Sequence, residues 1–464
     1  MSLKINMVKK SKEKRGQFTT RLGVVAVTVG SAVGLGNIWR FPYEAGEGGG
    51  GAFLLVNILM VLVVGLPVVC AEFVIGRHTG ANVRRAFRQL VGERSGRLWG
   101  VIGFGGLLSS ILILGFYSVV AGWTMEYAFD AAFHGFEGYS AEDLHARFDS
   151  MSASNWRPAL WTVIFLLINY IVLRQGVEKG IERMSNVLMP CLFIIIIVFC
   201  INSLTMPGAA EGLRFLFKPD FSKLTSDVVL SAMGQAFFSL SLGLGCLITY
   251  SSYFSKDVPL VRTASMTAFL DLLVAILAGV MIFPAVFTFG QEPAAGPRLV
   301  YEVLPSIFGS MAGGRIWGVL FFVLLFMASL TSTVSMSEIS IAWLTEEKGM
   351  SRKKAVNVNM AVAVFLGVLC ALSFGCLNDI RIFGLTFFDL FDFVSSNVLL
   401  PLGGMLISIF VGWVLKRSLV RSELLMGVSR PGQFLNVVVS AVIFCLRYVA
   451  PVCIALVFLS GLIH

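Results

Sequence analysis

The chain has 464 residues, of which 56% are apolar and only 14% charged, and its mean hydropathy is +0.83. This composition excludes a soluble globular protein and predicts an all-α polytopic membrane protein. The net charge of +9 could suit nucleic acid, but the basic residues gather in alternate loops between apolar segments, so we expect no nucleic-acid partner.

Apolar segments long enough to span a lipid bilayer follow one another along the whole chain. Each span needs about 20 mostly apolar residues. We place eleven, at residues 22–43, 52–76, 100–128, 158–174, 184–204, 228–253, 260–288, 315–344, 355–375, 384–415 and 433–460. Basic residues crowd the tail at 1–21, and acidic residues crowd the loop at 126–156. The positive-inside rule therefore predicts a cytoplasmic N-terminus in a plasma membrane or bacterial inner membrane.

The first span contains a stretch that an uninterrupted membrane helix would not hold. Residues 30–42 read GSAVGLGNIWRFP, with three glycines, an asparagine, an arginine and a proline. Gly34 and Gly36 loosen the backbone, and the amides and carbonyls freed there need partners in the absence of water. Broken helices at membrane depth line cavities or lie buried in protein. The stretch therefore predicts a site for a small polar ligand.

The sixth span carries a second break of the same character. Residues 239–245 read SLSLGLG, and five spans separate the two breaks. Small residues also serve close helix packing, so one break alone would be ambiguous. Two breaks in corresponding positions predict an inverted repeat with a transporter site between its halves. We expect one half at 22–204, the other at 228–415, and an added span at 433–460.

Asp271 lies deep in the seventh span, where a carboxylate costs about 3 kcal/mol or more and needs a companion. No basic residue lies near it in sequence, so we expect a bound cation or a proton there.

Oxygen donors lie in the first and eighth spans. Ala32 and Val33 offer backbone carbonyls, Asn37 offers an amide oxygen, and the Ala328–Ser332 run adds a carbonyl and hydroxyls. Hard cations such as sodium prefer oxygen ligands. A lone hydroxyl in a membrane helix usually bonds to its own helix, so the eighth-span run means little by itself.

Arg40 and Asp392 lie toward the same ends of the first and tenth spans. They could form a gate, or they could be unrelated side chains that reach the interface. The chain shows no metal-ligand spacing, no phosphate-binding glycine loop and no nucleophile–base set, so we do not expect an enzyme.

Several motifs resemble those of the neurotransmitter:sodium symporter family. They are Arg21-Leu22-Gly23, AVGLGNIWRFP at 32–42, GGGGAF at 48–53, QAFFSLSLG at 235–243 and SLTS at 329–332. The resemblance runs from about residue 15 to the end. Eleven spans and the Gly180–Pro190 spacing are similar to its bacterial amino-acid transporters. It implies a leucine-transporter-like fold of 5+5 helices plus one, with spans 1 and 6 broken at mid-membrane.

The resemblance also implies two sodium sites. One would be held by Ala32, Asn37, Ser239 and Asp271 with the substrate carboxylate. The second would be held by Gly30, Val33, Ala328, Thr331 and Ser332.

The substrate residues that the resemblance implies are Ser31, Ala32, Gly34, Gly36, Ile113, Tyr117, Phe238, Ser239, Ser241, Leu244, Ser332, Ser335 and Met336. Tyr117 would donate its hydroxyl to the substrate carboxylate, and Phe238 would close over it. Arg40 with Asp392 would form the outer gate, and Arg15, Tyr253 and Glu346 would close the cytoplasmic side.

Two departures from the family pattern shape the expected activity. Where animal members hold chloride with a tyrosine and an asparagine, this chain has Asn57 and Asp271. The charge of Asp271 would replace chloride, so we expect chloride-independent symport. The pocket offers Leu244 and Met336 without a free counter-charge, which favours a neutral, hydrophobic or aromatic amino acid.

Proton coupling through Asp271, and an amino-acid sensor that does not translocate, remain as alternatives. The sequence leaves open the preferred amino acid, the sodium stoichiometry and the oligomeric state.

Overall fold

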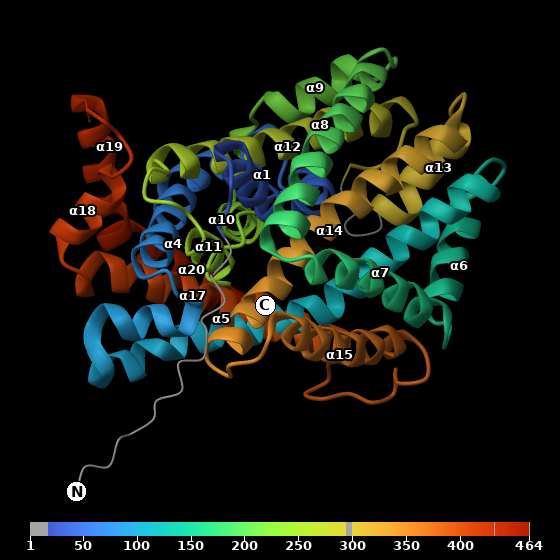
Figure 1. Cartoon of the computed structure of the whole chain (residues 1–464). Helices are drawn as coiled ribbons and strands as arrows, with labels where there is room; N and C mark the ends of the chain where they lie inside the picture. Colours follow the sequence, from blue (N-terminus) through green and yellow to red (C-terminus); the bar gives the residue numbers. More distant parts are fainter. Residues whose placement is uncertain (1–16, 294–298, 431, 464) are drawn as a thin grey trace, which may run out of the picture.

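The computed structural model describes residues 17–293, 299–430 and 432–463. Helices make up its regular structure, and they form one bundle in which α14 runs through the interior beside α1, α5 and α8 (Figure 1).

The first half of the chain, through residue 223, contains α1 (Arg21–Ala32), η1 (Gly36–Arg40), α2 (Phe41–Glu47), α3 (Gly51–Met60), η2 (Val61–Gly65), α4 (Leu66–Thr79), α5 (Val83–Phe133), α6 (Ala141–Ser152), α7 (Arg157–Arg174), η3 (Val177–Glu182), α8 (Arg183–Leu204), α9 (Ala209–Phe217) and η4 (Phe221–Lys223).

The second half contains α10 (Ser226–Ser239), α11 (Cys246–Ser251), α12 (Leu260–Thr288), η5 (Leu299–Val303), α13 (Leu304–Ser310), α14 (Gly314–Glu346), α15 (Arg352–Ala371), η6 (Leu372–Phe374), α16 (Phe387–Asp392), η7 (Phe393–Leu399), α17 (Leu400–Ile409), η8 (Phe410–Val414), α18 (Arg417–Leu425), α19 (Gln433–Phe444), η9 (Cys445–Val449) and α20 (Ala450–Ile463).

The predicted spans are present. Among the described residues, nine continuous helices are long and apolar enough to cross a membrane, and the pair Arg21–Ala32 and Gly36–Glu47 forms a further span bent by 53°. The sixth predicted span is divided into α10 and α11, with residues 240–245 between them. Both predicted breaks are therefore confirmed.

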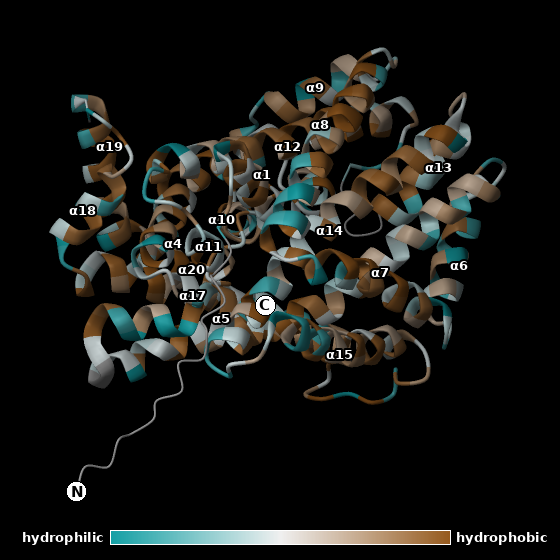
Figure 2. Cartoon of the chain, viewed as in Figure 1, coloured by the Kyte–Doolittle hydropathy of each residue, from teal (hydrophilic) through white to brown (hydrophobic). Residues whose placement is uncertain are grey.

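Burial separates inner from outer helices. Of the apolar window of Gly314–Glu346, 78% is buried, whereas only 28% of that of Gln433–Leu462 is buried. Large apolar side chains such as Leu167, Ile194 and Phe365 lie exposed on the outer helices, and outer spans such as α8 and α15 are mostly apolar (Figure 2). This is the pattern of a bundle surrounded by lipid, with its polar groups gathered inside.

Connecting segments add short helices. Before α14, η5 and α13 run together from Leu299 to Ser310. Helices α6, α9 and α18 lie outside the predicted spans. They are amphipathic but too short or too polar to be spans, so a search for apolar segments of about 20 residues does not find them.

Candidate binding site between the two broken helices

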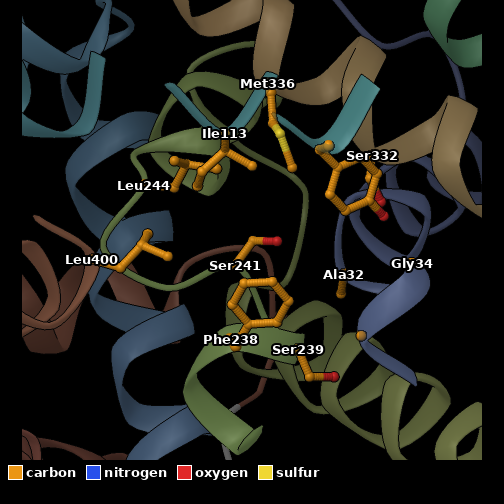
Figure 3. Close-up of a pocket in the computed structure, with 12 residues that line it drawn as sticks. Ala32, Gly34, Ile113, Phe238, Ser239, Ser241, Leu244, Ser332, Met336 and Leu400 are labelled. Carbon is orange, nitrogen blue, oxygen red and sulfur yellow. The ribbon is translucent and has the colours of Figure 1, made fainter. Parts of the chain in front are cut away.

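The two breaks meet at a small enclosed cavity of about 30 Å³ near the middle of the bundle. Its walls come from α1, η1, α5, α10, the second break, α14 and α17 (Figure 3). Its lining residues are Ala32, Gly34, Gly36, Ile113, Tyr117, Phe238, Ser239, Ser241, Leu244, Ser332, Met336 and Leu400. All but Leu400 are residues that the sequence analysis placed at the substrate site.

The first break satisfies its amides with side chains. Helix α1 ends where Val33 turns to an extended conformation, with φ −68° and ψ 114°. The Gly34 N–H then donates to Asn37 Oδ1 at 3.0 Å. The Leu35 N–H donates to the Tyr117 hydroxyl at 3.0 Å. Side-chain partners thus replace the helical bonds, as buried backbone groups require.

Glycine is needed at Gly34 because of close packing rather than backbone conformation. A Cβ there would lie 2.7 Å from Ser332 Oγ and 2.9 Å from the Tyr117 hydroxyl oxygen. At Gly36 a Cβ would approach the Phe238 ring to 3.2 Å. Both glycines therefore keep space open beside the cavity.

The second break is longer and uses left-handed backbone. Ser241, Gly243 and Gly245 have φ values of 53°, 80° and 80°. The Gly243 N–H donates at 2.8 Å to Oε1 of Glu72, which is fully buried in α4. The other carboxyl oxygen of Glu72 has no hydrogen-bond partner within the described residues.

The breaks are bonded to each other. Ser241 Oγ donates to the Ser31 carbonyl at 3.1 Å, and Gln235 Nε2 donates to the Gly36 carbonyl at 2.8 Å. The second half of the chain therefore supplies hydrogen-bond donors to backbone carbonyls of the first half at the site.

The residues of the first predicted sodium site lie together. Asn37 Nδ2 donates to Ser239 Oγ at 2.9 Å and to Asp271 Oδ1 at 2.8 Å. Ser239 Oγ donates to Asp271 Oδ2 at 2.6 Å. Asp271 and Asn37 are buried. This is a compact oxygen-rich cluster with one formal negative charge, and it adjoins the cavity through Ser239.

The residues of the second predicted sodium site meet where α1 and α14 cross. Ser332 Oγ donates to the Val33 carbonyl at 3.4 Å. Thr331 Oγ1 donates to the Ala328 carbonyl at 3.0 Å. A Cβ on Gly30 would lie 3.4 Å from Thr331 Cβ. The oxygens here are carbonyls and hydroxyls, which are hard neutral ligands.

Two predicted substrate residues do not line the cavity. Ser31 Oγ lies 3.1 Å from Cys246 Sγ. Ser335 Oγ accepts a 2.7 Å hydrogen bond from the Tyr250 hydroxyl and donates to the Thr331 carbonyl. In this conformation both serines support the neighbouring helices. Leu400, which does line the cavity, is an ordinary leucine in an apolar run and carries no signal in the sequence.

A larger cavity of about 220 Å³ lies on the other side of Phe238, which lines both cavities. Arg40 and Asp392 both line it. They do not pair in this conformation: Arg40 forms a 3.2 Å ion pair with Glu44, and Asp392 accepts a 2.7 Å hydrogen bond from Ser396. The two residues of the predicted gate therefore line the same cavity without pairing with each other.

The opposite end of the bundle is closed by a buried network. The Tyr253 hydroxyl donates to Glu338 Oε1 at 2.8 Å. Arg352 donates to both oxygens of Glu338, at 2.8 Å and 2.7 Å. Phe18 packs edge-on against Tyr253.

Of the residues predicted to close this end, Tyr253 belongs to the network. Glu346 accepts hydrogen bonds from the Asn82 backbone and side chain at 2.8 Å and 2.9 Å. Arg15 lies outside the described residues. The sequence analysis missed Glu338 and Arg352. Glu338 is fully buried in an apolar span, which is the signal that identified Asp271 and could have identified Glu338 too.

Comparisons with known proteins agree with this geometry. The model of the "Sodium:neurotransmitter symporter family" matches residues 15–137 and 136–464. An uncharacterized sodium-dependent transporter, YhdH of Bacillus subtilis, is 38% identical over 97% of this chain and 98% of its own length. A Haemophilus influenzae relative with the same description is 37% identical over 97% and 99%.

One solved structure, that of MhsT in complex with L-phenylalanine, matches with a TM-score of 0.87 and 43% identity. The match covers 96% of this chain and all of the other. It confirms the predicted leucine-transporter-like fold.

Proposed function

The chain belongs to the sodium:neurotransmitter symporter family and is a sodium-dependent transporter rather than an enzyme, and from that premise we propose its cargo and its coupling. It imports a neutral, hydrophobic or aromatic L-amino acid together with sodium, by alternating access in a bacterial inner membrane. Its N-terminus is cytoplasmic, and chloride is not required.

The observation that carries the proposal is that the central cavity has large apolar side chains on one side and small residues with freed backbone groups on the other. Ile113, Leu244 and Met336 lie along one side, and Ala32, Gly34 and Ser239 lie across from them (Figure 3). No charged side chain lines it within the described residues. An amino acid would place its charged ends against the freed backbone and the Tyr117 hydroxyl, and its side chain against the apolar residues. The related MhsT structure holds L-phenylalanine.

The clusters beside this cavity support coupling to two sodium ions. The Asn37–Ser239–Asp271 cluster offers one carboxylate, and the α1–α14 crossing offers neutral oxygens. Because one cluster adjoins the substrate carboxylate, sodium and substrate would raise each other's affinity. Asp271 supplies within the protein the negative charge for which animal relatives use chloride.

The two ends of the bundle support alternating access. The 220 Å³ cavity at the Arg40 end leads toward the site, and the Glu338–Arg352 network closes the other end. We assign the Arg40 end to the outside. Sodium entering with the membrane potential then drives uptake with about 2.3 kcal/mol per charge per 100 mV.

Uptake by proteoliposomes tests the proposal. We expect radiolabelled phenylalanine, leucine or tryptophan to accumulate with sodium outside and potassium inside, and aspartate or lysine to be excluded. Accumulation that persists without sodium but collapses with a proton ionophore would establish proton coupling instead. Sodium-dependent binding with no accumulation would establish a sensor.

The substitution Asp271→Asn tests the origin of chloride independence. It removes the fixed charge while keeping an oxygen ligand, so uptake in chloride-free buffer falls at least tenfold and added chloride restores part of it. Asp257→Asn, in the exposed loop before α12, is the matched control and leaves uptake unchanged. An Asp271→Asn variant that transports normally without chloride would contradict the assigned role.

A further inference from the structure

A cavity of about 300 Å³ lies where helices α1, α12 and α19 begin, and it shares no lining residue with the central site. Its walls include Arg21, Pro259, Arg262, Leu424, Val428 and Leu435. Arg21 is the first residue of α1, and Arg262 and Leu435 are the third residues of α12 and α19. Neither the fold nor the transport site accounts for two arginines around this hollow.

Both arginines lack protein partners. Arg21 and Arg262 are exposed, and neither forms an ion pair or hydrogen bond with any residue that the structure describes. Other arginines close to this cavity do have partners. Arg77 forms a 2.8 Å ion pair with Glu423, and Arg421 donates to Asn436 at 2.6 Å. Two solvent-exposed guanidinium groups without a carboxylate partner therefore contribute positive charge to this cavity.

The acidic residue in the adjoining loop does not neutralise them. Asp257 is exposed, and its carboxylate accepts a hydrogen bond from Ser255 at 3.4 Å. Its backbone carbonyl approaches Gly427, a lining residue. The hydroxyl-bearing Ser429 also lines the cavity, and it adds a hydrogen-bond donor without negative charge.

The cavity lies beside the first residues of two helices that are long and apolar enough to span a membrane. Helices α12 and α19 begin membrane spans at Leu260 and Gln433. Next to the lining residues, Leu22 is 73% exposed and Phe434 is 82% exposed. Apolar side chains that are so strongly exposed at the beginning of a span are expected to face the lipid acyl chains. A ligand bound here would therefore contact the two arginines with its polar part and the surrounding lipid chains with its apolar part.

We propose that this cavity binds the phosphate of an anionic phospholipid. Arg21 and Arg262 hold the phosphate with charge-assisted hydrogen bonds, and Leu435 and Phe434 contact the chains. Basic pockets between membrane helices on the cytoplasmic side bind such headgroups. Because Arg21 begins the half-helix before the first break and Arg262 lies on α12, one lipid would tie these two helices together.

Native mass spectrometry of the full-length protein with phosphatidylglycerol tests this. One lipid molecule is retained, whereas the variant Arg21→Gln/Arg262→Gln loses it. Each surface arginine contributes about 1 kcal/mol to anionic lipid binding, so affinity falls roughly fivefold for each substitution and about thirtyfold for both. Arg417→Gln, at an exposed position on α18 away from the cavity, is the matched control and retains the lipid. Melting temperatures in phosphatidylcholine nanodiscs confirm that all variants are folded.

The competing ligands give distinct results. Phosphatidylcholine, whose headgroup has no net charge, is retained less than phosphatidylglycerol. Inorganic phosphate at millimolar concentration does not displace the bound lipid. Equal retention by wild type and the double variant would overturn the proposal, as would full displacement by inorganic phosphate, which would show a small-anion site instead.

Discussion

The two breaks look alike in sequence but are held in different ways. The first covers three residues, 33–35, without any residue at positive φ. The second covers six, 240–245, with three residues at positive φ. The first directs carbonyls toward the oxygen clusters, whereas the second forms a wider loop on which Leu244 reaches the cavity. A short break suits ion ligation, and a longer one suits a shaped pocket.

Each break also depends on one remote side chain. Tyr117, a neutral hydroxyl, accepts from the Leu35 N–H. Glu72, a carboxyl group, accepts from the Gly243 N–H. Removing either acceptor leaves a buried N–H unsatisfied at a cost of about 1–3 kcal/mol, and truncating the fully buried Glu72 to alanine also leaves a cavity. The second break should therefore depend more strongly on its remote partner, and four substitutions test this.

Gly243→Ala should have the largest effect. The added Cβ would lie 2.3 Å from the Leu400 carbonyl oxygen at a φ of 80°, so strain and overlap together cost about 3 kcal/mol or more. Fluorescence-detected size exclusion should show little folded protein. Gly234→Ala, in helical α10 with no neighbour within 4 Å, is the control. Equal yields of both variants would contradict the close packing of the second break.

Glu72→Ala should have the second-largest effect, because it leaves the Gly243 N–H buried without an acceptor. We expect a loss of about 1.5–3 kcal/mol in stability and at least tenfold weaker substrate binding, measured by thermal unfolding and scintillation proximity. Glu72→Gln keeps an acceptor oxygen and should recover most of the loss. If Glu72→Ala and Glu72→Gln behave alike, the Gly243 bond is not what Glu72 provides.

Tyr117→Phe should cost less stability, about 1 kcal/mol, because it removes the acceptor of the Leu35 N–H but keeps the aromatic ring in place. Thermal unfolding without substrate measures this loss, because the Tyr117 hydroxyl is also proposed to contact the substrate. A loss greater than that of Glu72→Ala would reverse the comparison between the breaks.

The smallest effect that we expect is the difference in thermal stability between Ser241→Gly and Ser241→Ala. Both lose the bond to the Ser31 carbonyl, but glycine adopts the φ of 53° freely. We expect the glycine variant to be more stable by about 1 kcal/mol in thermal unfolding. An alanine variant as stable as the glycine variant would show that this backbone strain is unimportant.

The sequence predicted the breaks because their signal is local. Glycines and an asparagine inside an apolar run are visible without any fold. The partners of the breaks are remote: Leu35 bonds Tyr117, 82 positions away, and Gly243 bonds Glu72, 171 positions away. Such pairs depend on helix packing, which one sequence does not reveal. Glu72 itself was detectable, since a fully buried carboxyl group in an apolar span demands an explanation.

The gate proposed at Arg40 shows a different limit. The resemblance pointed to Asp392, yet in this conformation Arg40 pairs with Glu44, one helical turn away. The spacing of four residues favours that local pair in any helix. A pairing that changes during a transport cycle cannot be read from a motif, because a sequence specifies all states of the cycle at once.

The crosswise bonds between the breaks have a consequence for ancestry and engineering. Ser241 and Gln235 donate to the Ser31 and Gly36 carbonyls, on either side of the first break, and Asn37 donates to Ser239, the last residue before the second break. A replacement on one side leaves a polar atom on the other side without its partner, so we expect substitutions here to be tolerated best in matched sets. Exchanging one broken helix with that of a relative should yield inactive hybrids, while exchanging both together should succeed. The unit to exchange is therefore the pair of broken helices rather than either helix alone.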